Sequence, residues 1–214
     1  MTNLLILGAG GHAKVVAETA IAGEYASSIA FLDDCFDGSD SLTSVLNWPV
    51  IGTLKFSLEP EIRSKFASAV VAIGKASVRL KWIEKLQEAG FHLPVLMHPT
   101  SWVSGSVQIG SGSVVFANAT AQADALLGKG CILNTGCSID HDTQLGDCVH
   151  ICPGTRLAGE VKVGDRSWIG IGSSVIQQIR IGADVTVGAG AVVVRDLPDR
   201  VTAVGVPAKI LPVS

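Results

Sequence analysis

An aliphatic residue recurs at every sixth position along the second half of this chain. Between Val103 and Val193, sixteen positions at this spacing are aliphatic, and fifteen of them are Val, Ile or Leu. Neither the period of a helix nor the alternation of a flat strand produces such spacing. A coil with three flat faces does, because each hexapeptide supplies one short strand and one corner. The period therefore predicts a solenoid built from triangular turns of three hexapeptides each.

A second set of residues, four positions after each aliphatic one, is mostly small. We expect both sets to point into a narrow prism. Glycine also follows many of the aliphatic positions, as at Gly110, Gly146 and Gly164. We expect these glycines, and the aspartates that recur with them, at the corners, where a positive φ or a turn closed by a side chain is least costly.

The residues before the repeat have a different pattern, in which buried strands alternate with helices. The segments expected to form these elements are 3–20 (strand, Gly-rich turn and helix), 29–34 and 68–74 (strands), 77–90 (amphipathic helix) and 93–99 (strand). This order predicts a small parallel α/β domain over residues 1–95. The prism then covers residues 100–205, with a carboxyl-terminal tail at 206–214.

The Gly-rich turn from Gly8 to Ala13 matches a dinucleotide fingerprint, with Asp33 at the expected distance after it. The domain is too short for two mononucleotide halves, but one half binds one nucleotide. Backbone N–H groups at the start of the helix suit a diphosphate, and carboxylates after the second strand suit ribose hydroxyls or a base edge. A nucleotide-diphosphate sugar, a nicotinamide cofactor and a purely structural turn all remain open on this pattern.

Composition excludes several classes of protein. Apolar residues make up 48% of the chain, but no run reaches the roughly 18 to 20 residues that span a membrane. The first residues lack the basic start and cleavage site of a signal peptide, so we expect a cytoplasmic protein. The net charge of −3, without a Lys and Arg cluster, argues against nucleic-acid binding. Five cysteines without a C-x-x-C pair predict neither disulfides nor a zinc ribbon, and we expect them to be small buried residues.

His141 and His150 lie nine residues apart inside the repeat, and neither belongs to the inward-pointing sets. Nine residues is half of one triangular turn, so the two rings leave the prism in opposing directions and cannot cooperate within one protomer. If prisms pack side by side as a trimer, His141 of one protomer can face His150 of its neighbour. The spacing therefore suits a site shared between subunits.

The turn GAGGHAKVV, the acids of FLDD and the following hexapeptides together resemble a family of bacterial sugar acetyltransferases. This family includes the UDP-4-amino-sugar N-acetyltransferases of the bacillosamine pathway and the sialic acid O-acetyltransferases. The repeat segment closely resembles the left-handed parallel β-helix of hexapeptide acyltransferases. The resemblance implies a Rossmann-like half domain followed by a left-handed β-helix, assembled as a homotrimer with active sites at the subunit interfaces.

The resemblance also implies roles for individual residues. In the resembled enzymes, a base, its orienting acid and groups that contact acetyl-CoA lie at positions matched here by His141, Asp142, His150, Asn134, Ile171 and Ala189. The nucleotide-sugar site would be lined by Gly10, Gly11, His12, Asp33, Asp34 and Gly52. An imidazole is suited to accept a proton from an attacking amine at neutral pH, and a carboxylate on its other nitrogen fixes the tautomer. His150 or the Gly159 N–H could stabilise the oxyanion.

The function implied is N-acetylation of a UDP-4-amino-4,6-dideoxy sugar with acetyl-CoA as co-substrate, which gives UDP-N,N′-diacetylbacillosamine for bacterial glycan biosynthesis. O-acetylation of sialic acid or another sugar, and N-acetylation of GDP-perosamine, are alternatives that use the same base. A non-catalytic nucleotide-sugar-binding scaffold is the competing class. A γ-class carbonic anhydrase needs three metal-binding histidines, whereas the repeat holds only two, so no metal is expected.

Overall fold

The computed structural model describes residues 3–36 and 43–212, which form two compact units divided between Met97 and His98. The sequence places this division between residues 95 and 100. Residues 1–2, at the start of the predicted first domain, and residues 213–214, at the end of the predicted tail, lie outside the described residues. No helix in the described ranges is long and apolar enough to cross a membrane.

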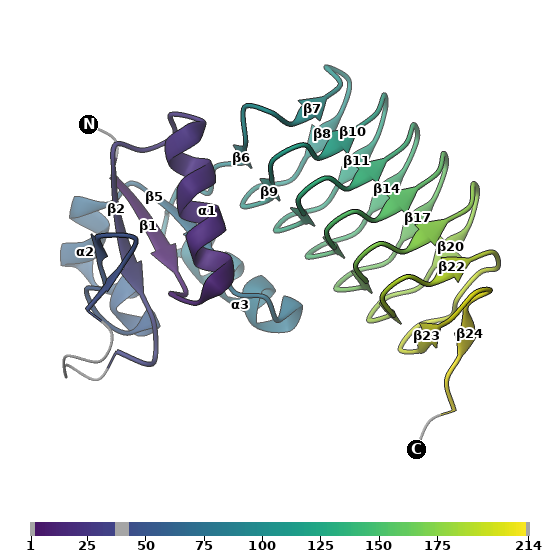
Figure 1. Cartoon of the computed structure of the whole chain (residues 1–214). Coiled ribbons are helices and arrows are strands. Elements are labelled where there is room, and N and C mark those ends of the chain that lie inside the picture. Colours follow the sequence, from purple (N-terminus) through teal and green to yellow (C-terminus); the bar gives the residue numbers. More distant parts are fainter. Residues whose placement is uncertain (1–2, 37–42, 213–214) are drawn as a thin grey trace. The chain divides into compact units, whose positions relative to one another are not determined.

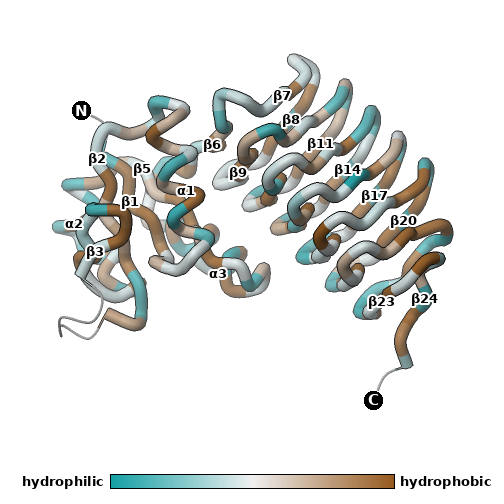
Figure 2. Tube along the Cα trace, viewed as in Figure 1, coloured by the Kyte–Doolittle hydropathy of each residue, from teal (hydrophilic) through white to brown (hydrophobic). Residues whose placement is uncertain are grey.

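The amino-terminal unit is built on a parallel sheet with the strand order β2-β1-β5. These strands are β1 (Asn3–Leu7), β2 (Ser28–Leu32) and β5 (Ser68–Val71). After its first residue each strand is buried throughout, as expected for a parallel sheet that is covered on both faces. Figure 2 shows the continuous hydrophobic character of β1 and β2.

The helices and the remaining short elements of this unit lie between the sheet strands or after the last of them, β5. They are α1 (Gly11–Ala22), β3 (Ser44–Val45), β4 (Trp48–Pro49), the 3₁₀ helix η1 (Leu54–Leu58), α2 (Pro60–Lys65), α3 (Ala76–Glu88) and β6 (Leu96–Met97). The sequence predicts α1, α3 and β6 but not the β3–β4 hairpin. Its two connecting residues, Leu46 and Asn47, both have positive φ. The sequence signal for such a two-residue turn is Asn-Gly, and Leu-Asn does not provide it.

The carboxyl-terminal unit is a prism of stacked coils with three sheets as its faces, in which all strands pair in parallel except β23 and β24 (Figure 1). The β13 face contains β7 (Trp102–Val103), β10 (Thr120–Ala121), β13 (Ser138–Ile139), β16 (Arg156–Leu157), β19 (Ser174–Val175) and β22 (Val192–Val193). The β14 face contains β8 (Gln108–Ile109), β11 (Leu126–Leu127), β14 (Gln144–Leu145), β17 (Lys162–Val163) and β20 (Arg180–Ile181). The β15 face contains β9 (Val114–Val115), β12 (Ile132–Leu133), β15 (His150–Ile151), β18 (Trp168–Ile169), β21 (Thr186–Val187), β23 (Thr202–Val204) and β24 (Lys209–Ile210).

The register of these faces is the predicted one. Paired residues in the strands from β7 to β22 lie eighteen positions apart, as Ile139 and Leu157 do, so three hexapeptides complete one coil. All sixteen periodic aliphatic residues are the second residue of a strand from β7 to β22. From Val115 onward they are all buried. The small residues fill the rest of the interior, and the polar ones are bonded there: Ser113 Oγ donates to the Gly128 carbonyl over 3.1 Å and accepts from the Cys131 N–H over 2.9 Å.

The glycines after the aliphatic positions do not have positive φ, so this part of the expectation is wrong. The positive φ values lie two residues later, at every sixth residue from Gly112 to Gly190, and include non-glycine residues such as Asp142. Glycines such as Gly110 and Gly164 are required for a different reason. A Cβ on either would lie 2.4 to 2.5 Å from a backbone nitrogen of the next coil, so only glycine permits the close stacking.

One of the five cysteines also departs from expectation. Cys35 is exposed, whereas the other four are buried. It lies in the loop after β2, where its N–H donates to Asp33 Oδ1 over 2.9 Å. Its position is therefore set by the loop rather than by the packing of its side chain.

Candidate active site

The predicted base lies at the corner between β13 and β14. Asp140, His141 and Asp142 form this corner, and the His141 ring is half exposed. His141 Nδ1 donates to Asp142 Oδ2 over 2.8 Å. Because a carboxylate only accepts, Nδ1 carries the proton and Nε2 is left with a lone pair. Asp140 Oδ1 instead accepts from the main-chain N–H of His141 over 2.8 Å, so Asp142 is the acid on the ring.

Gly159 lies on the next coil, directly against the imidazole. A Cβ at this position would lie 2.5 Å from both Cε1 and Nε2 of His141. The chain continues alongside the corner, because the Glu160 N–H donates to the His141 carbonyl over 2.9 Å. Glycine at position 159 therefore makes room for the imidazole ring in the position where Asp142 holds it.

The carboxylates around His141 raise its pKa above the ordinary value of an imidazole. The hydrogen bond that His141 donates to Asp142 is the largest cause, and the charges of Asp140, Asp142 and Glu160 act in the same direction, partly offset by desolvation. A base must be unprotonated to accept a proton. The raised pKa therefore shifts the acidic limb of a pH–rate profile toward higher pH.

Asp142→Asn is expected to move the acidic limb of kcat/KM to lower pH and to lower the plateau value by about tenfold or more, because the ring loses its charged partner and its fixed tautomer. Asparagine tolerates the positive φ of 58° at this position, so the corner is retained. The pH profile of kcat/KM is the measurement. Asp140→Asn is the matched control and should shift the limb less, because this carboxylate bonds to the main chain. An unchanged limb in Asp142→Asn would contradict the assignment.

His150 lies on the β15 face, away from the His141 corner. Asn134 Nδ2 donates to His150 Nε2 over 3.0 Å, and Asn134 Oδ1 accepts from the Thr135 N–H over 2.8 Å. Trp168, the partner of His150 in the next coil, holds its ring 5.1 Å from the imidazole, centroid to centroid. The structure therefore brings Asn134 and His150 together, and it adds Trp168 to them.

Ile171 and Ala189 lie on the corners that follow β18 and β21. They occupy equivalent positions in successive coils, and the Gly190 N–H donates to the Ile171 carbonyl over 2.8 Å. Both side chains are exposed. Asn134, His150, Trp168, Ile171 and Ala189 thus form one surface, which we call the His150 surface. The His141 corner lies elsewhere on the same protomer, as the nine-residue spacing predicts.

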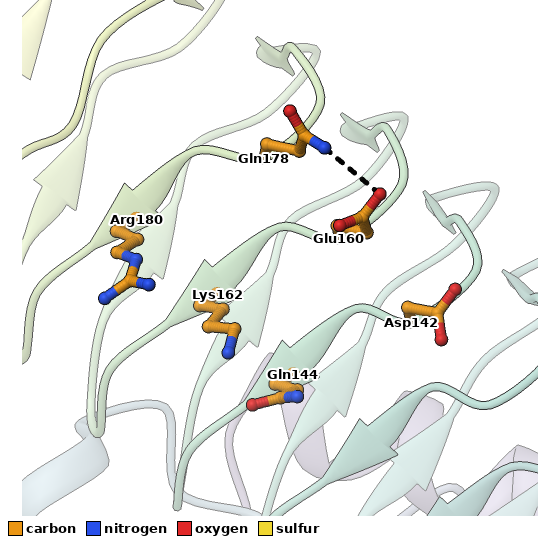
Figure 3. Close-up of a pocket in the computed structure, with 6 residues that line it drawn as sticks. All are labelled: Asp142, Gln144, Glu160, Lys162, Gln178 and Arg180. Atoms are coloured by element: carbon orange, nitrogen blue, oxygen red, sulfur yellow. Dashed lines mark hydrogen bonds between the residues drawn. The ribbon is translucent and has the colours of Figure 1, made fainter.

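A groove of about 510 Å³ opens beside Asp142 on the β14 face (Figure 3). Its lining forms two rows: Asp142, Glu160 and Gln178 on successive corners, and Gln144, Lys162 and Arg180 on successive strands. Only Asp142 among them is a predicted site residue. Glu160 and Gln178 follow from Asp142 by the eighteen-residue period, and Lys162 and Arg180 follow from Gln144 in the same way. This period is the signal that could have found them.

The predicted nucleotide site lies at the carboxyl ends of β1 and β2. Gly8 has a φ of 105°, and a Cβ there would lie 2.7 Å from the Ala72 carbonyl oxygen, so this position requires glycine. A Cβ on Gly10 or Gly11 would meet nothing within 4 Å. Their lack of side chains leaves space over the start of α1, which no side chain caps. A diphosphate fits such a helix start.

The carboxylates of the two acids after β2 accept hydrogen bonds from the surrounding loops. Asp33 Oδ2 accepts from the Ala9 N–H over 2.7 Å, and Asp34 Oδ1 accepts from the Leu54 N–H over 3.0 Å. The Gly52 carbonyl accepts from the Asp33 N–H over 3.0 Å. Asp33, Asp34 and Gly52 therefore join the Gly-rich turn to the loops on either side, and each carboxylate keeps lone pairs for a ligand.

His12 is mostly buried in the first turn of α1, and its pKa is lowered to about 4 by desolvation and by the nearby Arg79 guanidinium. Arg79 is almost completely buried, and its Nη1 donates to the Ile73 and Gly74 carbonyls over 2.8 Å each. His12 is therefore neutral at physiological pH. A neutral ring can donate and accept one hydrogen bond each.

The unfolding free energy should fall by up to about 3 kcal/mol as the pH drops from 6.5 to 4, because the unfolded chain protonates His12 in this range and the folded chain does not. Denaturant titrations over this range measure the effect. His12→Gln should lose this part of the pH dependence. An identical pH dependence in both proteins would contradict the burial of a neutral ring.

In the described ranges, no group of three or more His, Cys, Asp and Glu side chains is arranged to hold a metal ion. His141 and His150 belong to separate surfaces, and His98 Nδ1 hydrogen-bonds with the Thr100 hydroxyl over 2.9 Å.

Comparisons with known proteins identify both units. Residues 3–86 match the family model of the PglD N-terminal domain, and residues 160–195 match that of the bacterial transferase hexapeptide, six repeats. A UDP-N-acetylbacillosamine N-acetyltransferase of Bacillus subtilis (strain 168) is 40% identical over 118 residues, or 55% of this chain. The alignment spans about half, 52%, of that relative.

Solved structures resemble the chain over nearly its whole length. The acetyltransferase domain of PglB from Neisseria gonorrhoeae FA1090, in complex with acetyl coenzyme A, is 45% identical with a TM-score of 0.90, covering 98% of both chains. PerB from Caulobacter crescentus, in complex with CoA and GDP-perosamine, is 42% identical with a TM-score of 0.91, covering 99% of this chain and 98% of PerB. With its α/β unit, its hexapeptide prism and these relatives, the chain belongs to the PglD-type family of hexapeptide-repeat sugar N-acetyltransferases.

Proposed function

We propose that this protein transfers the acetyl group of acetyl-CoA to the amino group of a nucleotide-linked amino sugar. The acceptor is of the UDP-4-amino-4,6-dideoxy type, so that the product is UDP-N,N′-diacetylbacillosamine. The observation that carries the proposal is the His141–Asp142 pair, bonded over 2.8 Å in a chain that is 45% identical to a domain solved with acetyl coenzyme A.

In this reaction the unprotonated amine attacks the thioester carbonyl, and His141 Nε2 accepts the proton that the nitrogen loses. Asp142 holds the Nδ1–H and stabilises the imidazolium. The tetrahedral intermediate collapses with cleavage of the carbon–sulfur bond, and the imidazolium returns its proton to the CoA thiolate. We assign Asn134, His150, Gly159, Ile171 and Ala189 to the binding of acetyl-CoA and its developing oxyanion.

The nucleotide part of the acceptor is assigned to the amino-terminal unit. The open space over Gly10 and Gly11 at the start of α1 accepts a diphosphate, and neutral His12 contributes hydrogen bonds without charge. The remaining lone pairs of Asp33 and Asp34, beside Gly52, accept from hydroxyl or base N–H groups.

The assembly assigned to this function is a homotrimer in which His141 of one protomer faces the His150 surface of its neighbour. Two apolar side chains of that surface support this assembly: Trp168 is 47% exposed and Ile171 is 55% exposed. Covering such groups with a neighbouring prism removes apolar area from water. A shared site also explains why two histidines on separate parts of one protomer serve one reaction.

A panel of acceptors tests the proposal. The release of free thiol from acetyl-CoA is measured with a UDP-4-amino sugar, GDP-perosamine and sialic acid. We expect turnover with the UDP-linked amine. GDP-perosamine is the second candidate because PerB, 42% identical, was solved with it. Turnover with sialic acid alone would contradict N-acetylation, and no thiol release with any acceptor would favour a non-catalytic scaffold.

A further inference from the structure

The side-chain amide of Asn134 has a fixed orientation. Its Oδ1 accepts from the Thr135 N–H over 2.8 Å, and its Nδ2 lies 3.0 Å from His150 Nε2. If the two amide groups were exchanged, Nδ2 would meet the Thr135 N–H and two donors would face each other. The bond to the main chain therefore orients the amide so that Nδ2 donates to His150.

This orientation also determines which nitrogen of His150 carries the ring proton. Nε2 accepts a hydrogen from Asn134, so it is unprotonated and the proton lies on Nδ1. Nδ1 is buried within the protomer. His150 is therefore a neutral ring, and neither of its nitrogens presents a hydrogen to a ligand on the His150 surface.

The neighbours of His150 hold its ring in this position. The Trp168 ring lies 5.1 Å from the imidazole, centroid to centroid, at an angle of 35°. Burial raises the pKa of the Cys152 thiol to about 12, and a hydrogen bond with Trp168 acts against this rise. The bond to Cys152 restrains the indole, and the indole opposes a flip of the imidazole that would bring Nδ1 to the surface.

Asn134, in contrast, keeps a hydrogen for a ligand. An amide nitrogen carries two hydrogens, and His150 Nε2 accepts one of them. The side chain of Asn134 is only partly buried, so its amide is accessible from the His150 surface. Asn134 is therefore the side chain of this pair that can donate to a bound group.

The position of Asn134 brings this donor to the expected path of acetyl-CoA. The residue after it begins a row of corner residues in successive coils, in which the carbonyls of the first three members accept from the next coil: Thr135, Pro153, Ile171 and Ala189. The coils are about 4.8 Å apart. Ile171 and Ala189 are assigned to acetyl-CoA, so a pantetheine arm that continues along the row from them reaches Asn134 with its thioester.

Resting on the proposed function, we propose that Asn134, and not His150, donates the side-chain hydrogen bond to the thioester oxygen of acetyl-CoA. As the amine nitrogen bonds to the carbonyl carbon, the π electron pair moves to this oxygen, and the second Nδ2 hydrogen stabilises the negative charge there. Asn134 loses no proton, because the amine proton passes to His141 Nε2. His150 is a positioning residue, since its Nε2 orients the amide. The oxyanion role expected for His150 from the sequence thereby passes to Asn134.

The first test measures the protonation of His150 in the enzyme without substrates. In protein labelled with the NMR-active nitrogen isotope, long-range imidazole correlations at neutral pH should show a protonated Nδ1 and an unprotonated Nε2. The His150→Gln variant identifies the His150 signals by their loss. A protonated Nε2 would overturn the proposal, because His150 could then donate to the thioester itself. This measurement needs no turnover, so it is independent of the proposed function.

The second test removes the amide hydrogens without changing the shape of the side chain. Asn134→Asp should lower kcat by at least about 10²-fold, the usual effect of losing one oxyanion donor, and leave the KM of acetyl-CoA within about threefold. Asn118→Asp is the matched control. Asn118 is exposed on the same prism, and aspartate tolerates its positive φ of 59°. This variant should retain kcat within about twofold, and thermal unfolding verifies that both variants are folded.

A third variant, Asn134→Ala, distinguishes the two donors, because it removes the amide and leaves the imidazole. Donation by Asn134 predicts a fall in kcat of at least about 10²-fold. Donation by His150 predicts a kcat near that of wild type, since Nε2 no longer bonds to the amide. A near-wild-type kcat in folded Asn134→Ala would overturn the proposal alone. Absence of wild-type turnover with every amino sugar would overturn the proposed function, and the catalytic role of Asn134 with it.

Discussion

His141→Ala is expected to lower kcat by at least about 10²-fold, because the amine then has no positioned base to accept its proton. The ring is half exposed and hydrogen-bonded only within its own corner, so its removal leaves the prism interior unchanged. Steady-state release of free thiol from acetyl-CoA measures the effect.

His92→Ala is the matched control, since His92 is exposed, lies in the amino-terminal unit and has no assigned role in the reaction. It should retain the wild-type kcat. Near-normal turnover in His141→Ala, with thermal unfolding unchanged, would remove His141 from the mechanism.

Gly159→Ala is expected to lower kcat by about tenfold or more while the protein remains folded. The added Cβ would lie 2.5 Å from Cε1 and Nε2 of His141, a separation that atoms in proteins essentially never have. The imidazole must move, and it then loses the 2.8 Å bond to Asp142 or the position from which Nε2 meets the amine. Small displacements of a catalytic group have large effects on rate.

Gly105→Ala is the control for this substitution, because an added Cβ at Gly105 meets nothing within 4 Å and neither glycine requires a positive φ. A crystal structure of Gly159→Ala should show a displaced His141 ring. Full activity with an undisplaced ring would mean that the site does not depend on this close approach.

The sequence predicts the prism almost completely because one physical requirement repeats without interruption. An inward aliphatic residue is needed once on every face of every coil, so the positions from Val103 to Val193 fix the strands and their eighteen-residue register. The sequence predicts less well which backbone constraint requires glycine at a given position. Gly164 is required by the stacking of the next coil, whereas the positive φ falls at Arg166, and sequence alone does not distinguish these causes.

In the candidate site, too, the sequence predicts some features and not others. The spacing of His141 and His150 correctly predicts separate positions on one protomer, because nine residues is half of a coil. The close approach of Gly159 to His141 depends on the eighteen-residue stacking and on the rotamer of the ring, which no sequence pattern specifies. In the amino-terminal unit, the bond from the Ala9 N–H to Asp33 likewise appears only once the loops are in place.

Mixed assemblies test the central claim most directly, namely that one site uses His141 from one protomer and His150 from the next. His141→Ala and His150→Ala chains are co-expressed with different tags, and trimers that carry both tags are isolated. A shared site restores activity in these trimers to roughly a third of the wild-type level, because one of the three interfaces in each then combines two intact histidines. Activity no higher than that of the homogeneous variants would contradict the shared site.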